Sequence, residues 1–426
     1  PTLLDRIIQQ MFKQVLELIA EAKFYKHSYG FRPLRSASHA KARLDTLINR
    51  GGFHYTVDID IKGFFDNVNH TLLNKQLWNI GIRDKRVLKI ISKMLKSPIQ
   101  NEGIPNKGTP QGGILSPLLA SIVLNNLDQW IAGQWEDFQT QKEYSTFRER
   151  YRAQGTTNLK KGFLIRYADD FKILCKDSKT AWKWFYAVKD FIKNRLNLDI
   201  SNEKSKVINL RKRHTEFLGY KIKAIKKGTK YVAKSNVRDK KIKEIQSKLK
   251  SRIKSIQAKP SSLTVKDFNA TVLGIHNYFK YATHGYKDFD KLSFSLSRTM
   301  YNRLKNVADY GYPKNANTTY KKYYGHVRRK TYSIGNSYLY PIVGVKHQSN
   351  MNFTQTLTPY TDEGRKLIAK KLDGILEAEI IKLMKADVKD RSTEYLDNRI
   401  SRYSMKKGQC EITKQFIGAN EAICHH

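Results

Sequence analysis

Cysteine, acidic side chains and long apolar runs are all scarce in this sequence of 426 residues. Only three cysteines occur, which is too few for a disulfide framework and fits a reducing compartment. No apolar run reaches membrane-spanning length and no signal peptide opens the chain, so we expect a cytoplasmic protein without a membrane partner. Internal repeats and low-complexity tracts are absent too, and the length predicts two to four domains with proper cores.

The deficit of acidic residues leaves a large positive charge. Asp and Glu number 38 against 79 Lys and Arg, giving a formal net charge of +41. Folding alone gives no reason for such a surplus, so it indicates a polyanionic partner. The 24 tyrosines add ring faces on which bases can stack. A ribosomal or histone-like protein would share the charge, but not this length or the carboxylate cluster described next.

Two adjacent carboxylates stand between short apolar runs in residues 163–175. This pattern predicts a β-hairpin whose tip presents Asp169 and Asp170. Like charges side by side repel, so a fold tolerates them where solvent or a cation relieves the repulsion. A solvated turn is the plain alternative. A bound Mg²⁺ ion is the more specific hypothesis, because Mg²⁺ binds carboxylate oxygens and leaves coordination positions open for phosphate.

A third carboxylate comes from residues 55–61, where apolar and polar side chains alternate as in a strand. Asp58 and Asp60 would share one face, while Tyr55, Val57 and Ile59 face a core. Phosphoryl transfer that uses two ions about 3.5–4 Å apart needs such a cluster. The hairpin aspartates and one strand aspartate would supply it.

Three segments resemble the palm motifs of reverse transcriptases, in the right order: residues 60–66, 108–117 and 167–170. Their wording is closest to the group II intron-encoded enzymes that also act as RNA maturases. The resemblance implies an α+β fold of the right-hand polymerase type, with a fingers remnant, a palm and a helical thumb. It also implies RNA-directed DNA synthesis by two-metal phosphoryl transfer.

The same resemblance assigns roles in catalysis. Asp60, Asp169 and Asp170 would be ligands of two Mg²⁺ ions, with Asp58 as second choice for the strand carboxylate. Phe65 would close against the sugar 2′ position and exclude ribonucleotides, unless it is an ordinary core aromatic. Lys204, in a block like the one that follows the aspartates in the family, is a candidate general acid for pyrophosphate departure.

Further positions resemble residues that contact nucleotide or template. Arg32 lies in a Gly- and Pro-punctuated loop like the family's second block, although it could equally tie loop carbonyls together. Gln111 and Gly112 lie in the block that resembles the template grip. There glycine lets backbone approach nucleic acid, and the glutamine offers a donor and an acceptor. Residues 216–220 resemble the element that holds the primer end.

Apolar spacing predicts several helices along the chain. Residues 1–22 form an amphipathic pattern, Asn69 and Asp84 look like N-caps of two further helices, and a fourth helix starts at Ser116 and Pro117. Residues 133–162 look like a polar insertion, and helical spacing returns over 181–196. Residues 239–258 place an apolar stripe opposite lysines, which suits a thumb along a duplex backbone.

We expect four regions: fingers remnant and palm at 1–225, helical thumb or maturase domain at 226–305, DNA-binding region at 306–395, and a truncated HNH endonuclease start at 396–426. In the last, His425 would bind a divalent metal and His426 would activate water, with nuclease activity only in a full-length parent. Thr413 replaces a cysteine of a zinc knuckle, which argues against structural zinc. The absence of an initial Met and the terminal histidines indicate a fragment cut at both ends.

The expected function is therefore extension of a DNA primer or target on intron RNA, with deoxynucleoside triphosphates as substrates and with help to intron splicing. Two alternatives stay open: a mainly non-catalytic RNA-binding splicing cofactor, and a retron or diversity-generating type of reverse transcriptase. The sequence leaves open the oligomeric state, the intron and the target site.

Overall fold

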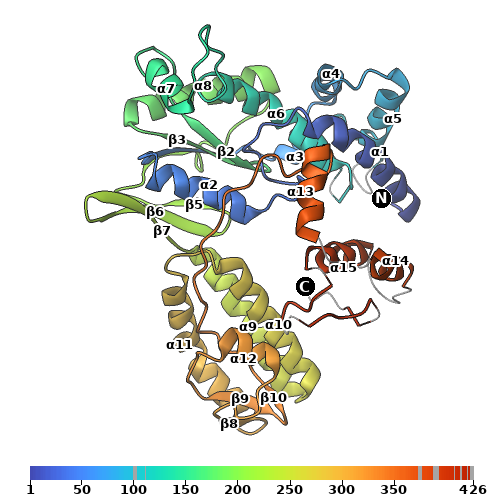
Figure 1. The fold of residues 1–426 in the computed structure, drawn as a ribbon, viewed down its shortest axis with the longest axis vertical. Coiled ribbons are helices and arrows are strands. Elements are labelled where there is room, and N and C mark those ends of the chain that lie inside the picture. The colour runs from blue at the N-terminus through green and yellow to red at the C-terminus, as the bar shows by residue number, and fades with distance from the viewer. Residues whose placement is uncertain are drawn as a thin grey trace. The chain divides into compact units, whose positions relative to one another are not determined.

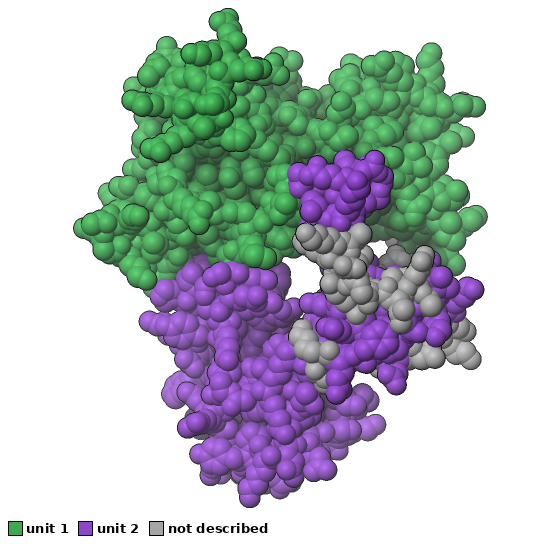
Figure 2. Space-filling view, viewed as in Figure 1, with its two compact units in different colours: residues 1–234, 350–355 green, residues 235–349, 356–426 purple. Residues whose placement is uncertain are grey.

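The structure is a computed structural model that describes residues 1–98, 103–110, 112–372, 377–386, 393–406, 408–412, 415–419 and 421–422. The chain divides into two compact units, which Figure 2 colours separately. Unit 1 comprises residues 1–234 and 350–355, and unit 2 comprises residues 235–349 and 356–426. The expected boundary at residue 225 falls inside strand β6 (Tyr220–Lys227).

An antiparallel sheet in the order β2-β3-β1-β4 forms the centre of unit 1. Its strands are β1 (Tyr55–Ile59), β2 (Phe163–Tyr167), β3 (Asp170–Cys175) and β4 (Lys206–Asn209). The predicted hairpin is confirmed, with β2 and β3 joined by a two-residue turn. Strand β1 lies between β3 and β4, so a strand from early in the chain is the direct neighbour of the hairpin.

Helices cover this sheet and share its core. Helix α8 (Ser178–Leu196) contacts β1, β3 and β4, and helix α6 (Ser116–Gly133) contacts β2. Figure 1 shows both on one side of the sheet and α2 (Ala37–Asn49) on the other. The remaining helices of unit 1 are α1 (Leu3–Glu21), α3 (Phe64–Asn67), α4 (His70–Ile80), α5 (Lys85–Leu95) and α7 (Phe147–Gln154).

Capping chemistry sets the predicted helix starts. The Asn69 side chain accepts a hydrogen bond from the Leu72 amide at the start of α4, and Asp84 accepts one from the Arg86 amide at the start of α5. Helix α6 carries a proline in its first turn, where a missing amide hydrogen costs nothing. All three predicted helices are confirmed.

Helix α1 forms as predicted but buries little of its apolar stripe. Thr2 and Asp5 cap it reciprocally, and Leu16 and Ala20 are buried. Phe12 and Ile19 are partly buried against the core. Most other apolar side chains of the helix are exposed over much of their surface, among them Leu3, Leu4, Ile7, Met11, Val15 and Leu18. Periodicity therefore identified the helix, but not which part of it contacts a core.

A second sheet in the order β5-β6-β7 follows the palm, with β5 (Thr215–Phe217) and β7 (Lys230–Val237) flanking β6. Leu218 and Gly219 form the two-residue turn between β5 and β6, and both have positive φ. Two successive positive φ values define the type I′ turn that matches the twist of a hairpin. Residues 216–220, expected to hold a primer end, are therefore a tight β-turn.

In unit 2, helix α9 (Asp239–Ala258) packs against α10 (Ser262–Phe279) and α11 (Gly285–Leu304). A small sheet in the order β10-β9-β8 follows, built from β8 (Asp309–Gly311), β9 (Thr331–Ile334) and β10 (Ser337–Tyr338). The other helices are α12 (Thr318–Tyr324), α13 (Asp362–Leu372), α14 (Glu377–Lys385) and α15 (Thr393–Met405). None of the helices in the described ranges could cross a bilayer, because none combines the necessary length and hydropathy.

Candidate active site

The β2-β3 turn presents the two hairpin aspartates at one end of the central sheet. Tyr167 pairs with Asp170, so Ala168 and Asp169 form the turn itself. Ala168 has φ +58°. This left-handed conformation is unfavourable in free energy for any residue that has a Cβ atom. Asp169 is exposed, and 43% of the Asp170 side chain is exposed, so solvent and a phosphate can reach both.

Asp60 lies beside this turn. Strands β1 and β3 are antiparallel, and their register pairs Asp58 with Lys172 and Ile59 with Phe171. Ile59 and Phe171 form the last pair, so Asp60 directly follows β1 at the end of the sheet where Asp170 begins β3. The Asp60 side chain is 44% exposed. The three aspartates proposed from the sequence therefore converge on one accessible edge.

Asp58 lies on the same strand but is otherwise engaged. Only 9% of its side chain is exposed, and it accepts hydrogen bonds from the hydroxyls of Thr56 and Thr215 at 2.8 and 2.5 Å. The Lys172 Nζ is 3.2 Å from it. The alternation in the sequence suggested one exposed polar face, but β1 is a central strand with both faces covered. Of the two strand carboxylates, Asp60 is the one available to a ligand.

Negative charge is crowded at the tip. Burial of the carboxylate raises the pKa of Asp170, although 43% of the side chain is exposed. The positive charge of Lys172 opposes this shift. The nearby Asp58 and Asp169 raise the pKa of Asp170 further. Burial by itself would lower the pKa of Lys172, but Asp58 and Asp170 raise it overall. The site favours an additional positive charge near Asp170.

The donor set fits Mg²⁺ chemically, since it consists of carboxylate oxygens, some of them exposed. It is not a preformed cage: within the described part of the chain, no three or more His, Cys, Asp or Glu side chains are already arranged around a common point. Lysines compensate the charge instead. Lys204 Nζ lies 3.4 Å from Asp60, and because that pair is largely exposed it contributes little stability. A cation could replace it at low cost.

Phe65 is held at its backbone by the segment that resembles the template grip. Its carbonyl accepts a hydrogen bond from the Thr109 amide at 2.7 Å, and Gly108 donates to the Val68 carbonyl at 2.7 Å. The Phe65 ring is half-buried against the core and meets Phe64 edge to face. It also lines a narrow crevice with Phe31 and Ala168. Phe65 thus lies next to the turn that carries Asp169, the position that its expected role requires.

The template-grip residues are described only in part. Gly112 is exposed with φ +77°, a conformation that favours glycine, and a Cβ there would meet nothing within 4 Å. Gln111 lies outside the described residues.

The geometry of Arg32 favours the structural alternative. Its Nε and Nη2 donate to the Glu21 carboxylate at 2.7 and 2.8 Å, and its Nη1 donates to the carbonyls of Tyr25 and Ser28. The residue is only 7% exposed. All three guanidinium nitrogens are engaged, two with the end of α1 and one with the loop, so Arg32 ties the loop to the helix rather than facing a template.

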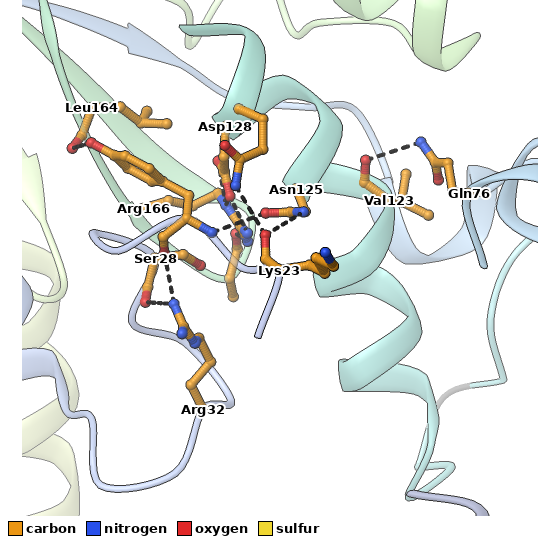
Figure 3. Close-up of polar contacts among 12 residues, drawn as sticks. Lys23, Ser28, Arg32, Gln76, Val123, Asn125, Asp128, Leu164 and Arg166 are labelled. Atoms are coloured by element: carbon orange, nitrogen blue, oxygen red, sulfur yellow. Dashed lines mark hydrogen bonds and ion pairs between the residues drawn. The ribbon is translucent and has the colours of Figure 1, made fainter. Parts of the chain in front are cut away.

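Sequence reasoning missed three residues that support the turn: Asp128, Arg166 and Gly30. Arg166 and Asp128 form a fully buried ion pair, shown in Figure 3. Each left a signal that could have been used. Arg166 interrupts an apolar strand, and Asp128 stands at a position of α6 where helical spacing from Leu124 and Ile131 calls for an apolar residue.

The proposed nuclease histidines, His425 and His426, lie outside the described residues, as does Thr413. Of the neighbouring chain, Arg399 is buried and donates hydrogen bonds to the carbonyls of Ala419 and Ala422. A small core there includes Leu383 and Tyr403. The nuclease assignment stays a prediction.

Similar proteins bear on the assignment of this site. The family model for "Reverse transcriptase (RNA-dependent DNA polymerase)" matches residues 1–222. Group II intron-encoded protein LtrA of Lactococcus lactis subsp. cremoris is 34% identical, over 54% of this chain and 44% of that protein. Putative COX1/OXI3 intron 1 protein of Saccharomyces cerevisiae is 28% identical, over 51% of this chain and 30% of that protein. Nuclear intron maturase 2 of Arabidopsis thaliana is 27% identical over 32% of this chain and 24% of that protein.

The chain therefore matches less than half the length of these relatives. Among solved structures, telomerase from Candida albicans in complex with a telomeric RNA fragment is 13% identical, with a TM-score of 0.37, over 70% of this chain and 53% of that one. The family match covers more than half of the chain and all three aspartates at the tip. The chain belongs to the reverse transcriptase family, with the α+β right-hand polymerase fold.

Proposed function

We propose that this protein copies RNA into DNA, extending a DNA primer on an intron RNA template with deoxynucleoside triphosphates. One observation carries the proposal: in a chain of the reverse transcriptase family, the β1-β3 register ends at the pair Ile59–Phe171, which puts Asp60 and Asp170 at the same end of the sheet as the exposed Asp169. Templated nucleotidyl transfer needs clustered carboxylates that phosphate can reach, and these three lie together at an open edge.

The residues at this edge divide the work. Asp60, Asp169 and Asp170 would hold two Mg²⁺ ions, which when bound lower the pKa of the primer 3′-hydroxyl and neutralise the departing pyrophosphate. Lys204, 70% exposed and 3.4 Å from Asp60, is free to swing toward a leaving group and donate a proton to it. Phe65 would exclude the 2′-hydroxyl of a ribonucleotide by occupying its space.

The nucleic-acid duplex would contact the basic surface of the chain. In α9, Ile245, Leu249 and Ile253 are buried, so the helix turns its other side outward. That outward side carries the exposed lysines Lys240, Lys243, Lys248, Lys250 and Lys254. A row of lysines along a helix suits binding to a phosphate backbone. Such binding weakens as the salt concentration rises, because it releases counterions from the nucleic acid.

Primer extension on an RNA template tests the proposal. The wild-type chain should incorporate deoxynucleotides, and Asp169→Asn with Asp170→Asn should abolish incorporation while primer-template binding persists. The matched control is Asp190→Asn with Asp290→Asn, which removes the same charge from exposed aspartates in α8 and α11. Equal extension by the site variant and wild type would contradict the proposal.

A second role, assistance to intron splicing, is favoured by the lysine face of α9, because RNA binding there needs none of the aspartates. The similarity to a protein named as an intron maturase supports it as well. Splicing of a group II intron should then survive the Asp169→Asn, Asp170→Asn substitutions and fail when Lys243, Lys250 and Lys254 become glutamine. The reverse pattern would reject a separate splicing surface.

A further inference from the structure

The guanidinium of Arg166 lies in the interior, directly beneath the turn that carries Asp169. The side chain is completely buried, and its partner Asp128 on α6 is 1% exposed. Arg166 Nε lies 2.8 Å from both carboxylate oxygens of Asp128, and Nη2 donates to one of them at 2.5 Å. Figure 3 shows the two side chains meeting between the helix and the hairpin. This fork holds the guanidinium in one orientation.

The remaining nitrogen of the guanidinium reaches the turn itself. Arg166 Nη1 donates a hydrogen bond to the carbonyl of Ala168 at 2.9 Å. Ala168 holds its left-handed backbone conformation without the help of glycine or asparagine, the residues that adopt it readily. A conformation of this kind persists only where its surroundings enforce it. The Arg166 hydrogen bond is one such constraint, acting on the residue directly before Asp169.

The loop of residues 25–32 supplies the second constraint, because it lies along the free edge of β2. The Arg166 amide donates to the His27 carbonyl at 3.1 Å, and the Tyr29 amide donates to the Arg166 carbonyl at 2.9 Å. A Cβ at position 30 would stand 2.3 Å from the Ala168 amide nitrogen, so only glycine permits this approach. The loop therefore touches the turn from the side opposite β3.

Helix α6 anchors this loop as well as the arginine. Asn125, one turn before Asp128, accepts a hydrogen bond from the Tyr25 amide at 3.0 Å and donates to the Lys23 carbonyl at 3.2 Å (Figure 3). One face of α6 thus fixes both the loop and the guanidinium. Together they surround the turn with contacts that are buried or partly buried.

Taking the proposed polymerase function as given, we propose that Asp128 and Arg166 are positioning residues that set the backbone of the Ala168–Asp169 turn and thereby the catalytic carboxylates. Neither contacts substrate. A buried ion pair is weak support for stability, since apolar side chains of similar volume often serve as well. What an apolar pair cannot supply is the donor to the Ala168 carbonyl, and this difference makes the role testable.

The experiment compares Arg166→Lys with the paired replacement Arg166→Met plus Asp128→Leu in the full chain. Lysine keeps the charge but cannot form the two parallel hydrogen bonds to Asp128. The apolar pair removes both buried charges, so no unpaired charge is left in the interior to oppose folding. We expect the paired variant to melt near the wild-type temperature while its kcat for extension falls roughly 100-fold, because small displacements of reacting groups have effects of that size. KM for the deoxynucleotide and the affinity for primer-template should change less than threefold.

Amide hydrogen exchange gives a readout that does not need activity. In the paired variant the amides of residues 168–170 should exchange at least tenfold faster, while those of 171–175 in β3 keep their protection. Wild-type kcat together with wild-type exchange in the paired variant would overturn the positioning role. If the wild-type chain does not extend a primer, the proposed function is contradicted instead. The exchange experiment would still decide the positioning role.

Discussion

Lys172 Nζ lies 3.2 Å from the carboxylate of Asp58, and both side chains are almost completely buried. Without Asp58 the buried Lys172 keeps only its longer contact with Asp170, at 3.7 Å. Loss of the main partner of a buried charge costs about 3 kcal/mol of the free energy of unfolding, the low end of the range for broken buried ion pairs. We therefore expect Asp58→Ala to destabilise unit 1 by that amount. Asp60→Ala, at an exposed position two residues on, should leave stability nearly unchanged.

Urea unfolding followed by tryptophan fluorescence measures this difference, because all five tryptophans lie within residues 1–234. Adding Lys172→Met to Asp58→Ala should recover part of the lost stability, since the buried cation is then gone. Equal stability of Asp58→Ala and Asp60→Ala would show that the ion pair between Asp58 and Lys172 does not stabilise the fold.

Phe65 should determine the choice of sugar. Replacing it with alanine opens space beside the turn, so we expect the preference for deoxynucleotides over ribonucleotides to fall by roughly tenfold or more, as expected when a filled contact is removed. Phe65→Tyr keeps the ring and should keep the preference. The ratio of deoxynucleotide to ribonucleotide incorporation opposite one RNA template base measures the preference. An unchanged ratio in Phe65→Ala would show that Phe65 is an ordinary core aromatic.

Gly30→Ala tests the close approach of the loop to the turn. The added methyl would meet the Ala168 backbone at 2.3 Å, so either the loop or the turn must move. We expect a loss of about 1–3 kcal/mol in stability, the usual cost of overpacking, with a slower extension rate. The matched control is Gly133→Ala at the end of α6, where a Cβ meets nothing within 4 Å and φ is not positive.

Thermal unfolding and extension rates of the two glycine variants give the comparison. Gly133→Ala should be neutral or slightly stabilising, because alanine reduces the freedom of the unfolded chain. If both variants behave alike, the approach of Gly30 to Ala168 is not a constraint.

His276 makes the stability of unit 2 dependent on pH. Burial lowers its pKa to about 4, and the ring bonds the Tyr324 hydroxyl and the Ile342 carbonyl at 3.0 and 2.9 Å. The folded state therefore favours the neutral ring, whose unfolded pKa is about 6.5. This contribution is complete above pH 6.5 and is lost as pH falls toward 4, by about 3 kcal/mol in total.

Hydrogen exchange at the α10 amides reports this local stability, since unit 2 contains no tryptophan. Exchange, corrected for the intrinsic effect of pH, should accelerate between pH 6.5 and 4. His276→Gln lowers stability at all pH values but should flatten the dependence. A steep dependence that persists in His276→Gln would assign it to other groups.

Much of the fold could be predicted because its signals are local. The hairpin, the α9 stripe, and the caps Asn69 and Asp84 depend on residues a few positions apart, and all are confirmed. The alternation around Asp58 was less informative, because local patterning does not show that β1 is central and covered on both faces. The partial burial of α1 likewise depends on what packs against it.

The support beneath the turn could not be predicted for a different reason. Asp128 and Arg166 are 38 residues apart, and Gly30 approaches Ala168 from more than 130 residues away in the chain. Sequence spacing gives no measure of such distances. A charged residue in an apolar strand and another on an apolar helix face indicate that each needs a partner, but not that the two are each other's partner.

The central claim is that Asp60, Asp169 and Asp170 act as one site for shared cations. The most direct test is the single-turnover rate of primer extension for Asp60→Asn, for Asp170→Asn and for the variant with both. Groups that act as a unit are strongly non-additive, so each single substitution should reduce the rate about 1,000-fold or more and the double should be scarcely slower. Near-normal extension by Asp60→Asn, or two independent effects that multiply in the double variant, would contradict a shared site.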